Sequence, residues 1–200
     1  MPRSLVARHP DLSPLLAERP QRAKLLDAMV RAVGEKGYEA ATVADAVRIA
    51  QVSRGTFYEL FDSKQACLEA AYDLGVEVLE ERITEAVRGA ADWRDELRLG
   101  LRAYLQALSG EPRFARVHLL EWQALGGRRD AALRRFAARY GRSFARSGRP
   151  VPPPEALFVL AAGIDQLVRA RLRDGADVTD LEDTLVGCTL RLAGEEGPWT

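Results

Sequence analysis

The chain has few of the residues from which most catalytic and metal sites are built. It contains two cysteines, Cys67 and Cys188, and two histidines, His9 and His118. Neither pair has the spacing of a zinc site or of a CxxC motif, so we expect no metal, no disulfide framework and reduced thiols. A glycine-rich phosphate loop is also absent, as is a nucleophile with a base at motif spacing. We therefore expect neither a cofactor nor an enzyme.

Long apolar runs and an excess of one charge are lacking too. The longest apolar stretch, residues 156–164, ends at Asp165 and is much shorter than the ~20 residues that cross a bilayer. Because no signal peptide is evident, we expect a cytoplasmic protein. The 29 basic and 29 acidic side chains balance, which argues against a nucleic-acid binder that relies on net charge. Any binding of DNA has to depend on a local patch.

What the sequence does contain is a series of helical patterns separated by glycine and proline, with an informative stretch at residues 42–64. Thr42 is an N-cap residue followed by apolar residues at helical spacing, which predicts a helix over residues 43–50. Ser53 is a second N-cap and predicts a helix that begins at Arg54. The two residues between them leave room only for a tight turn, so the stretch predicts a helix-turn-helix.

The second of these helices has two chemically different faces. Phe57 and Phe61 are four residues apart and are expected to pack inward, which leaves Arg54, Thr56 and Tyr58 on the outer face. Arginine can donate two hydrogen bonds to a guanine edge, threonine can reach a phosphate or a thymine methyl, and tyrosine offers a hydroxyl to phosphate. We interpret this helix as a recognition helix that enters the major groove by its N-terminal half.

A family pattern is carried by three segments that begin at Arg22, Val52 and Gln65: RAKLLDAMVRAVGEKGYEAATV, VSRGTFYELFDSK and QACLEAAYD. These segments resemble the N-terminal DNA-binding domain of TetR-type transcriptional regulators. The resemblance implies an all-α protein of about nine helices, with a three-helix head that contains the helix-turn-helix and a helical body that binds a ligand and dimerises. The predicted DNA-binding residues are Thr42, Ser53, Arg54, Gly55, Thr56, Tyr58 and Lys64. For Lys64 the two alternatives are a phosphate contact, which the resemblance favours, and a lysine exposed to solvent.

Two positions depart from the family pattern. The family usually has glycine where this chain has Gln51, so Gln51 is expected to adopt a left-handed backbone at a cost of roughly 1 kcal/mol. Family members often have histidine or tyrosine where this chain has Leu60, which removes one contact to the DNA backbone. Both departures concern the affinity for DNA rather than the fold.

The glycine and proline positions divide the chain into four parts. We expect a flexible arm over residues 1–20, a DNA-binding head over 21–66, a helical body over 67–194 and a tail over 195–200. Helices of the head and body are predicted over residues 21–36, 43–50, 54–61, 63 to the eighties, 92–109, 112–125, 128–147, 154–174 and 178–193. In the arm, Arg3 and Arg8 either reach into a minor groove or belong to a solvated tail.

The apolar faces of the body have two interpretations, the core of a helix bundle or the lining of a small-molecule pocket. Side chains that combine bulk with a few polar atoms fit a pocket. The tentative ligand-binding residues are Leu101, Tyr104, Leu105, His118, Trp122 and Asp165. Asp165 interrupts an apolar helix and either bonds across a dimer, faces the ligand or is partly solvated.

Apolar stripes on the last two helices indicate where a second copy of the chain binds. One stripe consists of Leu157, Leu160, Ile164 and Leu167, and the other of Leu181, Leu185, Cys188 and Leu192. The resemblance implies that these helices form a four-helix interface between two chains. We therefore expect a homodimeric repressor that binds a palindromic operator and is released by a small, mostly apolar ligand. The alternatives are a ligand-independent architectural or chromosome-associated DNA-binding protein with the same head, and a helical protein-binding module that no longer binds DNA.

Overall fold

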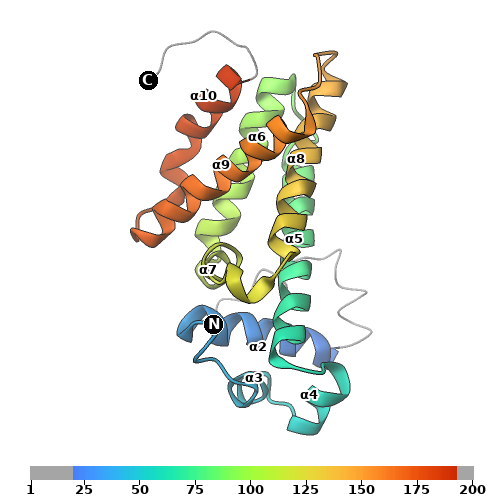
Figure 1. The fold of residues 1–200 in the computed structure, drawn as a ribbon, viewed down its shortest axis with the longest axis vertical. Helices are drawn as coiled ribbons and strands as arrows, with labels where there is room; N and C mark the ends of the chain where they lie inside the picture. Colours follow the sequence, from blue (N-terminus) through green and yellow to red (C-terminus); the bar gives the residue numbers. More distant parts are fainter. Residues whose placement is uncertain (1–19, 193–200) are drawn as a thin grey trace. The chain divides into compact units, whose positions relative to one another are not determined.

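The computed structural model describes residues 20–192, apart from the side chain of Trp122. Over this range the chain forms nine α-helices, two short 3-10 helices and no strand (Figure 1). The all-α prediction is therefore confirmed. The arm with Arg3, Arg8 and His9 and the tail predicted over 195–200 lie outside the described residues. Among the helices described, each is too short or too polar to cross a lipid bilayer.

Two compact units make up the chain, and each is described by itself. The first consists of the residues up to Val78 together with Glu111–Arg129, and the second of Leu79–Gly110 together with the residues from Asp130. The boundary that the sequence predicts at residue 66 falls inside the first unit.

Three helices, α2 (Pro20–Lys36), α3 (Val43–Ala50) and α4 (Arg54–Leu60), begin the first unit. The apolar positions of α2 recur at helical spacing, and α2 packs against α3. Fully buried on α2 are Leu25, Leu26, Met29 and Val33. Gly37 ends α2 with a φ of 81°, a left-handed conformation that favours glycine, and its amide donates to the Val33 carbonyl at 2.8 Å. The helix-turn-helix follows directly.

Helix α5 (Lys64–Ala86) is capped by Ser63, whose Oγ accepts a hydrogen bond from the Ala66 amide at 3.0 Å. Its residues up to Val78 belong to the first unit and the remainder to the second. Cys67 is fully buried on α5, and its thiol donates to the Leu25 carbonyl of α2 at 3.8 Å. Burial raises the pKa of the Cys67 thiol to about 12, so Cys67 packs in the core as a neutral thiol.

Helix α7 (Pro112–Leu120) approaches two other helices of the first unit so closely that only glycine fits. A Cβ atom on Gly34 of α2 would lie 2.8 Å from the Cβ of Arg113. One on Gly75 of α5 would overlap the ring of Phe114. Real Cβ atoms do not approach other atoms within 3.0 Å, so α7 is held between α2 and α5 at these two positions.

The single helix predicted over residues 112–125 is wrong, because the α-helix stops at Leu120. The Glu121 amide donates to the Arg116 carbonyl, five residues back, at 3.3 Å, and a 3-10 helix, η2 (Trp122–Leu125), follows. The helix predicted over 178–193 is divided in the same way. It consists of η3 (Val178–Leu181) and α10 (Glu182–Leu192), and Asp177 caps η3 by accepting from the Thr179 amide at 3.0 Å.

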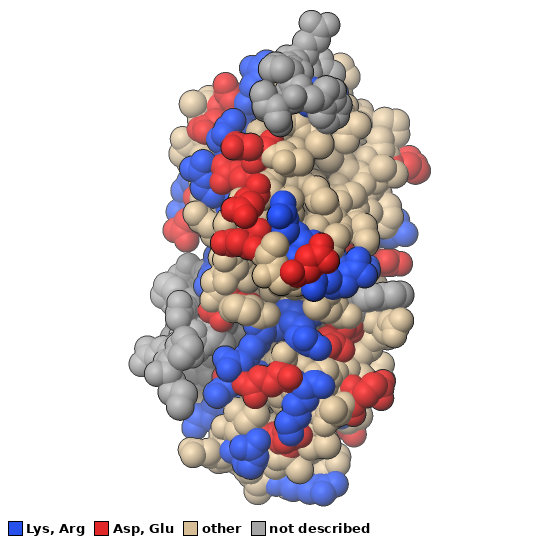
Figure 2. All heavy atoms as spheres, turned by 90° about the vertical axis from the view of Figure 1, so that its left-hand side faces the viewer, with Lys and Arg blue, Asp and Glu red and all other residues tan. Residues whose placement is uncertain are grey.

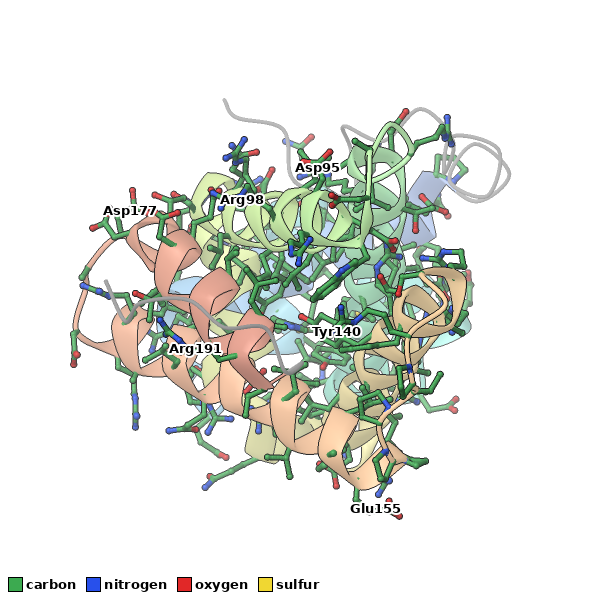
Figure 3. All side chains as sticks on the ribbon, turned by 90° about the horizontal axis from the view of Figure 1, so that it is seen from above. Asp95, Arg98, Tyr140, Glu155, Asp177 and Arg191 are labelled. Carbon is green, nitrogen blue, oxygen red and sulfur yellow. The ribbon has the colours of Figure 1, made fainter. Side chains whose placement is uncertain are left out.

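In the second unit, η3 and α10 pack on α6 (Trp93–Gly110). The Arg102 guanidinium of α6 donates to both carboxylate oxygens of Glu182 at 2.7–3.0 Å, and these hydrogen bonds lower the pKa of Glu182. Arg98 lies 3.4 Å from Asp183 one turn away. Figure 3 shows Asp95 and Arg98 on the outer side of α6. The α6–α10 contact therefore has a charged edge.

The other pair of helices in this unit is α8 (Arg128–Arg146) and α9 (Pro154–Arg173). Their buried contact consists of Ala137, Phe144, Leu157 and Ala161, with Phe136, Tyr140 and Phe158 packed around it. Tyr140 points toward the interior in Figure 3, and burial raises the pKa of its hydroxyl. Apolar packing is therefore the main contact between α8 and α9.

One side of α9 carries exposed apolar residues. Val159 is 68% exposed and Leu167 is 38% exposed, and a Cβ on Gly163 between them would meet no atom within 4 Å. These residues are four apart, so they lie on one side of the helix. The predicted stripe is thus divided, because Leu157 and Ile164 are buried within the unit while Leu167 faces outward.

Candidate DNA-binding surface

Both helices of the helix-turn-helix begin at the predicted side-chain cap. Thr42 Oγ1 accepts from the Asp45 amide at 3.1 Å, and Asp45 Oδ2 accepts from the Thr42 amide at 3.1 Å, which is a reciprocal capping box. At the second helix, Ser53 Oγ accepts from the Thr56 amide at 2.9 Å. Helices this short are not stable alone, so these caps and the packing of the helices define them.

The turn between α3 and α4 has the backbone that the sequence predicts. Gln51 has φ 56° and ψ 46°, and among the described residues it is the only non-glycine residue with a positive φ. Its side chain is exposed, and its amide donates to the Val47 carbonyl. The left-handed turn is therefore formed without glycine, at a cost in conformational energy of about 1 kcal/mol.

The two faces of α4 are arranged as the sequence predicts. Phe57 is fully buried and Phe61 is 6% exposed, with their ring centroids 5.8 Å apart. On the outer face, Arg54 Nη2 lies 3.4 Å from the Tyr58 hydroxyl, and the guanidinium lies 5.6 Å from the Tyr58 ring centroid. Tyr58 is 47% exposed. Arg54 has no acidic partner among the described residues, so its charge is available to an external ligand.

Gly55, at the start of α4, has no structural reason to be glycine. A Cβ there would meet only Ser53 Oγ, at an ordinary contact distance of 3.5 Å, and its φ is not in the left-handed region. Glycine in a helix costs about 1 kcal/mol relative to alanine. A residue that lowers stability at an exposed helix start is typical of a place where another molecule approaches the backbone closely.

The hydroxyls of Thr42, Ser53 and Thr56 already serve the caps. Ser53 Oγ and Thr56 Oγ1 lie 2.9 Å apart, and Thr42 Oγ1 donates to Asp45 Oδ2 at 2.8 Å. Hydroxyl oxygens retain further capacity as acceptors and donors, so these contacts leave room for a phosphate. Ser53 and Thr56 lie close to Gly55 in the sequence, and Thr42 lies at the start of α3. Their role in DNA binding stays a prediction.

Lys64 has a more specific role within the protein than either sequence alternative. Its ammonium donates to the carbonyls of Tyr38 at 2.7 Å and Ala41 at 2.9 Å, and it lies 4.0 Å from the centroid of the Tyr38 ring. The side chain is half-buried. Lys64 therefore fastens the turn between α2 and α3 to the start of α5. An ammonium has three N–H groups, so one stays available for a phosphate.

Glu121 is a polar residue of this region that the sequence did not indicate. Its Oε2 accepts a hydrogen bond from the Tyr38 amide at 3.1 Å, and its Oε1 lies 3.6 Å from Arg116 Nε. No motif links residues 83 positions apart, so only the fold reveals this contact. Across the same turn, Lys36 Nζ donates to Asp45 Oδ1 at 2.6 Å. The hydrogen bonds from Lys36 and Thr42 hold the pKa of Asp45 well below its usual value.

Charges on the first unit are mixed rather than of one sign. In the lower part of Figure 2, basic side chains are interspersed with acidic ones. Arg48, with a side chain that is 71% exposed, shares Asp45 with Lys36. Binding of an anion to this unit therefore depends on particular residues such as Arg54, in line with the expectation of a local patch.

The structure assigns the tentative ligand-binding residues to both units. In the second unit, Leu101, Tyr104, Leu105 and Asp165 are all buried, and the Tyr104 ring lies 6.1 Å from that of Phe136. This arrangement suits a packed core as well as the wall of a ligand site. The two sequence interpretations of these side chains therefore both stand.

His118 belongs to the first unit and is 3% exposed. Its ring is stacked between those of Tyr72 and Phe114, each at a centroid distance of 5.3 Å. Burial, with a smaller effect of the nearby Arg129 charge, lowers the pKa of His118 to about 3. Its Nδ1 has no hydrogen-bond partner among the described residues. Trp122, the other candidate in this unit, has a side chain outside the described part of the structure.

A known family matches the first helices of this chain. The family model described as "Bacterial regulatory proteins, tetR family" matches residues 25–71, which extend from α2 into α5. Residues 25–71 are a tetR-family domain. The TetR-type resemblance is confirmed, and so is the assignment of α3 and α4 to a helix-turn-helix head.

Three relatives extend the comparison beyond residues 25–71. The fatty acid metabolism regulator protein of Bacillus subtilis (strain 168) is 28% identical over 104 residues, which are 52% of this chain and 54% of that protein. The chain thus aligns with about half the length of this curated relative. A TetR-family transcriptional regulator from Pectobacterium atrosepticum has a TM-score of 0.66 at 26% identity, over 88% of this chain and 94% of that one.

The third relative resembles this chain in fold. It is the transcriptional regulator FadR from Bacillus subtilis in complex with stearoyl-CoA, with a TM-score of 0.71 over 86% of this chain and 98% of that one. The identity is 19%, so this likeness shows the TetR-type fold alone.

Proposed function

We propose that this TetR-type protein is a transcriptional repressor that reads a palindromic operator with the N-terminal half of α4. The proposal rests on the arrangement of side chains at the start of α4. Arg54 and Tyr58 face outward there without an acidic partner among the described residues, beside a glycine that the fold does not require. In a helix-turn-helix this is the part of the recognition helix that contacts base edges.

The outer residues divide into two roles. Arg54 is the candidate for base recognition, because a guanidinium can donate two hydrogen bonds to guanine O6 and N7. Tyr58, Thr42, Ser53 and Thr56 offer hydroxyls to the phosphates, and the remaining N–H of Lys64 offers a positive charge. Gly55 lets the backbone approach the DNA. The protein acts where operator DNA is, so a cytoplasmic location belongs to the same proposal.

A second copy of the chain is the proposed partner of α9 and α10. The support is the apolar side of α9 with Val159, Gly163 and Leu167, together with Leu192 of α10, which is 72% exposed. A two-fold axis would present two recognition helices to half-sites about 34–36 Å apart. Replacing Val159 with Glu should shift the sedimentation coefficient to that of a monomer, while Arg88→Ala, on an exposed turn, should leave it unchanged.

The proposed effector is a small, mostly apolar molecule that binds the form of the protein that does not bind DNA. Long-chain acyl-CoA is the first probe, because the relatives are a fatty acid metabolism regulator and a regulator in complex with stearoyl-CoA. Leu101, Tyr104, Leu105 and Asp165 stay the candidates in the second unit, and His118 and Trp122 in the first. Helix α5 has residues in both units, so it offers a covalent route for coupling.

A ligand-independent DNA-binding protein is the second candidate function. It is favoured by the complete burial of Leu101, Tyr104 and Leu105, each at most 8% exposed, which is what a solid core requires. Stearoyl-CoA and free fatty acids should raise the melting temperature of the full chain if an effector site exists. If none of these compounds changes the melting temperature or the affinity for DNA, the effector part of the proposal is wrong.

Selection from random duplex DNA tests the core of the proposal. The wild-type chain should enrich a palindromic site and bind it in a fluorescence-anisotropy titration. Arg54→Ala should weaken binding to this site more than binding to unrelated DNA, whereas Tyr58→Phe and Lys64→Ala should weaken both. Arg88→Ala is the matched control for loss of a positive charge. Unchanged binding in all three variants would contradict the proposal.

A further inference from the structure

The turn between α2 and α3, residues 37–42, is fastened on two sides by charged side chains from distant parts of the first unit. Lys64 binds its carbonyls, as described above. On the other side the Tyr38 amide donates to Glu121 at 3.1 Å. Residues 37–42 lead directly into α3, so their geometry determines where the helix-turn-helix begins.

The Tyr38 amide needs an acceptor from outside its own helix. At the end of α2 the Gly37 amide donates to the Val33 carbonyl, which is the simple left-handed ending of a helix. In that ending the following amide, here that of Tyr38, has no partner within the helix. The Glu121 carboxylate supplies it, with a side chain that is 17% exposed. A charged acceptor of low exposure makes a stronger hydrogen bond than water would.

Glu121 can reach the turn because of how α7 is placed. It is the first residue after α7, where the helix ends and η2 begins. The close approach at Gly34 and the 2.8 Å contact between Arg113 and Glu35 fix α7 against α2. A Cβ on Gly37 would lie 3.5 Å from Glu121 Oε1, so the carboxylate lies directly over the turn. Arg116, at 3.6 Å, orients the same carboxylate from within α7.

We propose that Glu121 is a positioning residue for DNA recognition, which acts by holding the Tyr38 amide and thereby the start of the helix-turn-helix. The inference rests on the proposed DNA-binding function. Glu121 itself contacts no DNA in this account. It joins the end of α7 to the turn before α3, so any displacement of the end of α7 changes the geometry of α3 and α4.

The test compares three variants of the full chain with the wild type. Glu121→Ala removes the acceptor, Glu121→Gln keeps an amide oxygen of the same reach, and Arg116→Ala removes the orienting charge while leaving the carboxylate. Two quantities are measured. The first is hydrogen exchange of the Tyr38 amide without DNA, by NMR on protein with 15N-labelled tyrosine. The second is the affinity for a duplex site selected by the wild-type protein from random DNA.

Glu121→Ala is expected to accelerate exchange of the Tyr38 amide and to weaken binding of the selected duplex, each by about tenfold. Glu121→Gln should restore most of the exchange protection and most of the DNA affinity. Arg116→Ala should have the smallest effect on both quantities. If Glu121→Ala accelerates exchange but leaves DNA affinity unchanged, the positioning role is wrong while the proposed function stands. If the wild-type chain selects no duplex at all, the proposed function fails and the inference fails with it.

Discussion

Helices α4 and α7 are both short helices of the first unit, but they are held in opposite ways. The N-terminal half of α4 faces outward, and a Cβ on Gly55 would meet only one atom. Helix α7 lies against Gly34 and Gly75, where a Cβ would overlap neighbouring atoms, and His118 on it is buried between two rings. Close packing therefore explains the position of α7, whereas the N-terminal half of α4 leaves space for another molecule to approach.

The strongest expected contrast comes from the same substitution made on the two sides of this comparison. Gly34→Ala should lower the free energy of unfolding by about 2–3 kcal/mol, because its Cβ would meet backbone atoms of Arg113 as well as its side chain. Urea unfolding followed by circular dichroism measures it. Gly55→Ala, at the open position of α4, is the control and should not destabilise the protein. Equal effects at both positions would contradict the close packing of α7.

The buried histidine on α7 predicts a dependence of stability on pH. The pKa of His118 is about 3 in the folded chain and about 6.5 when unfolded. Below pH 6.5 the unfolded chain therefore binds a proton that the folded chain does not. The free energy of unfolding should fall as the pH decreases from 6.5 toward 3, by up to about 1.4 kcal/mol per pH unit from this residue.

Replacing His118 with Phe isolates this contribution. The variant keeps a ring between Tyr72 and Phe114 but cannot titrate, so its stability should fall less steeply between pH 6.5 and 4.5. Urea unfolding at three pH values gives both slopes. The only other histidine, His9, is present in both proteins and cancels. Equal slopes would show that His118 is not buried in its neutral form.

On α4, Gly55→Ala should separate stability from function. Alanine fits without overlap and favours a helix, so the free energy of unfolding should rise by about 0.5–1 kcal/mol. DNA affinity should fall, because the added methyl group keeps the backbone away from the duplex. Urea unfolding and fluorescence anisotropy on one preparation measure both. A variant that is more stable and binds DNA as tightly as the wild type would remove Gly55 from the binding surface.

The smallest expected effect concerns the turn before α4. Gln51→Gly should raise the free energy of unfolding by less than about 1 kcal/mol, since glycine relieves the left-handed strain but costs more entropy on folding. Thermal unfolding is the measurement, and Gln106→Gly, at an exposed position inside α6, is the control that should destabilise. A decrease for Gln51→Gly would mean that the Gln51 side chain has a stabilising contact of its own.

Local signals made the helix-turn-helix readable from the sequence. Thr42 and Ser53 cap their helices through residues three positions later, and Phe57 and Phe61 share a face by helical spacing. Contacts between residues that are distant in the sequence could not be predicted from it. Lys64 and Glu121 bind the turn at residues 37–42 through hydrogen bonds that span 23 to 83 positions. The local sequence around Glu121 does not oppose a longer helix. The end of α7 at this residue was therefore not predictable from local signals either.

The sequence of the body predicted where its helices lie, but it predicted less well which side of each helix is buried. Leu157, Ile164 and Leu167 follow one helical pattern, yet Leu167 faces outward while the other two are buried. Which side of an apolar helix becomes core depends on the packing of α8 and η3 against α9, and spacing within α9 alone does not encode it. The boundary between head and body and the sites for DNA and ligand stay predictions.

The most direct test of the account is the base preference of Arg54→Ala at a site selected by the wild-type protein. Each base pair of one half-site is substituted in turn, and the affinity of both proteins is measured by anisotropy. If Arg54 reads a base, Arg54→Ala should lose discrimination, worth about 1–3 kcal/mol, at one position per half-site and keep it elsewhere. An unchanged preference at every position would contradict the assignment of α4 as the recognition helix.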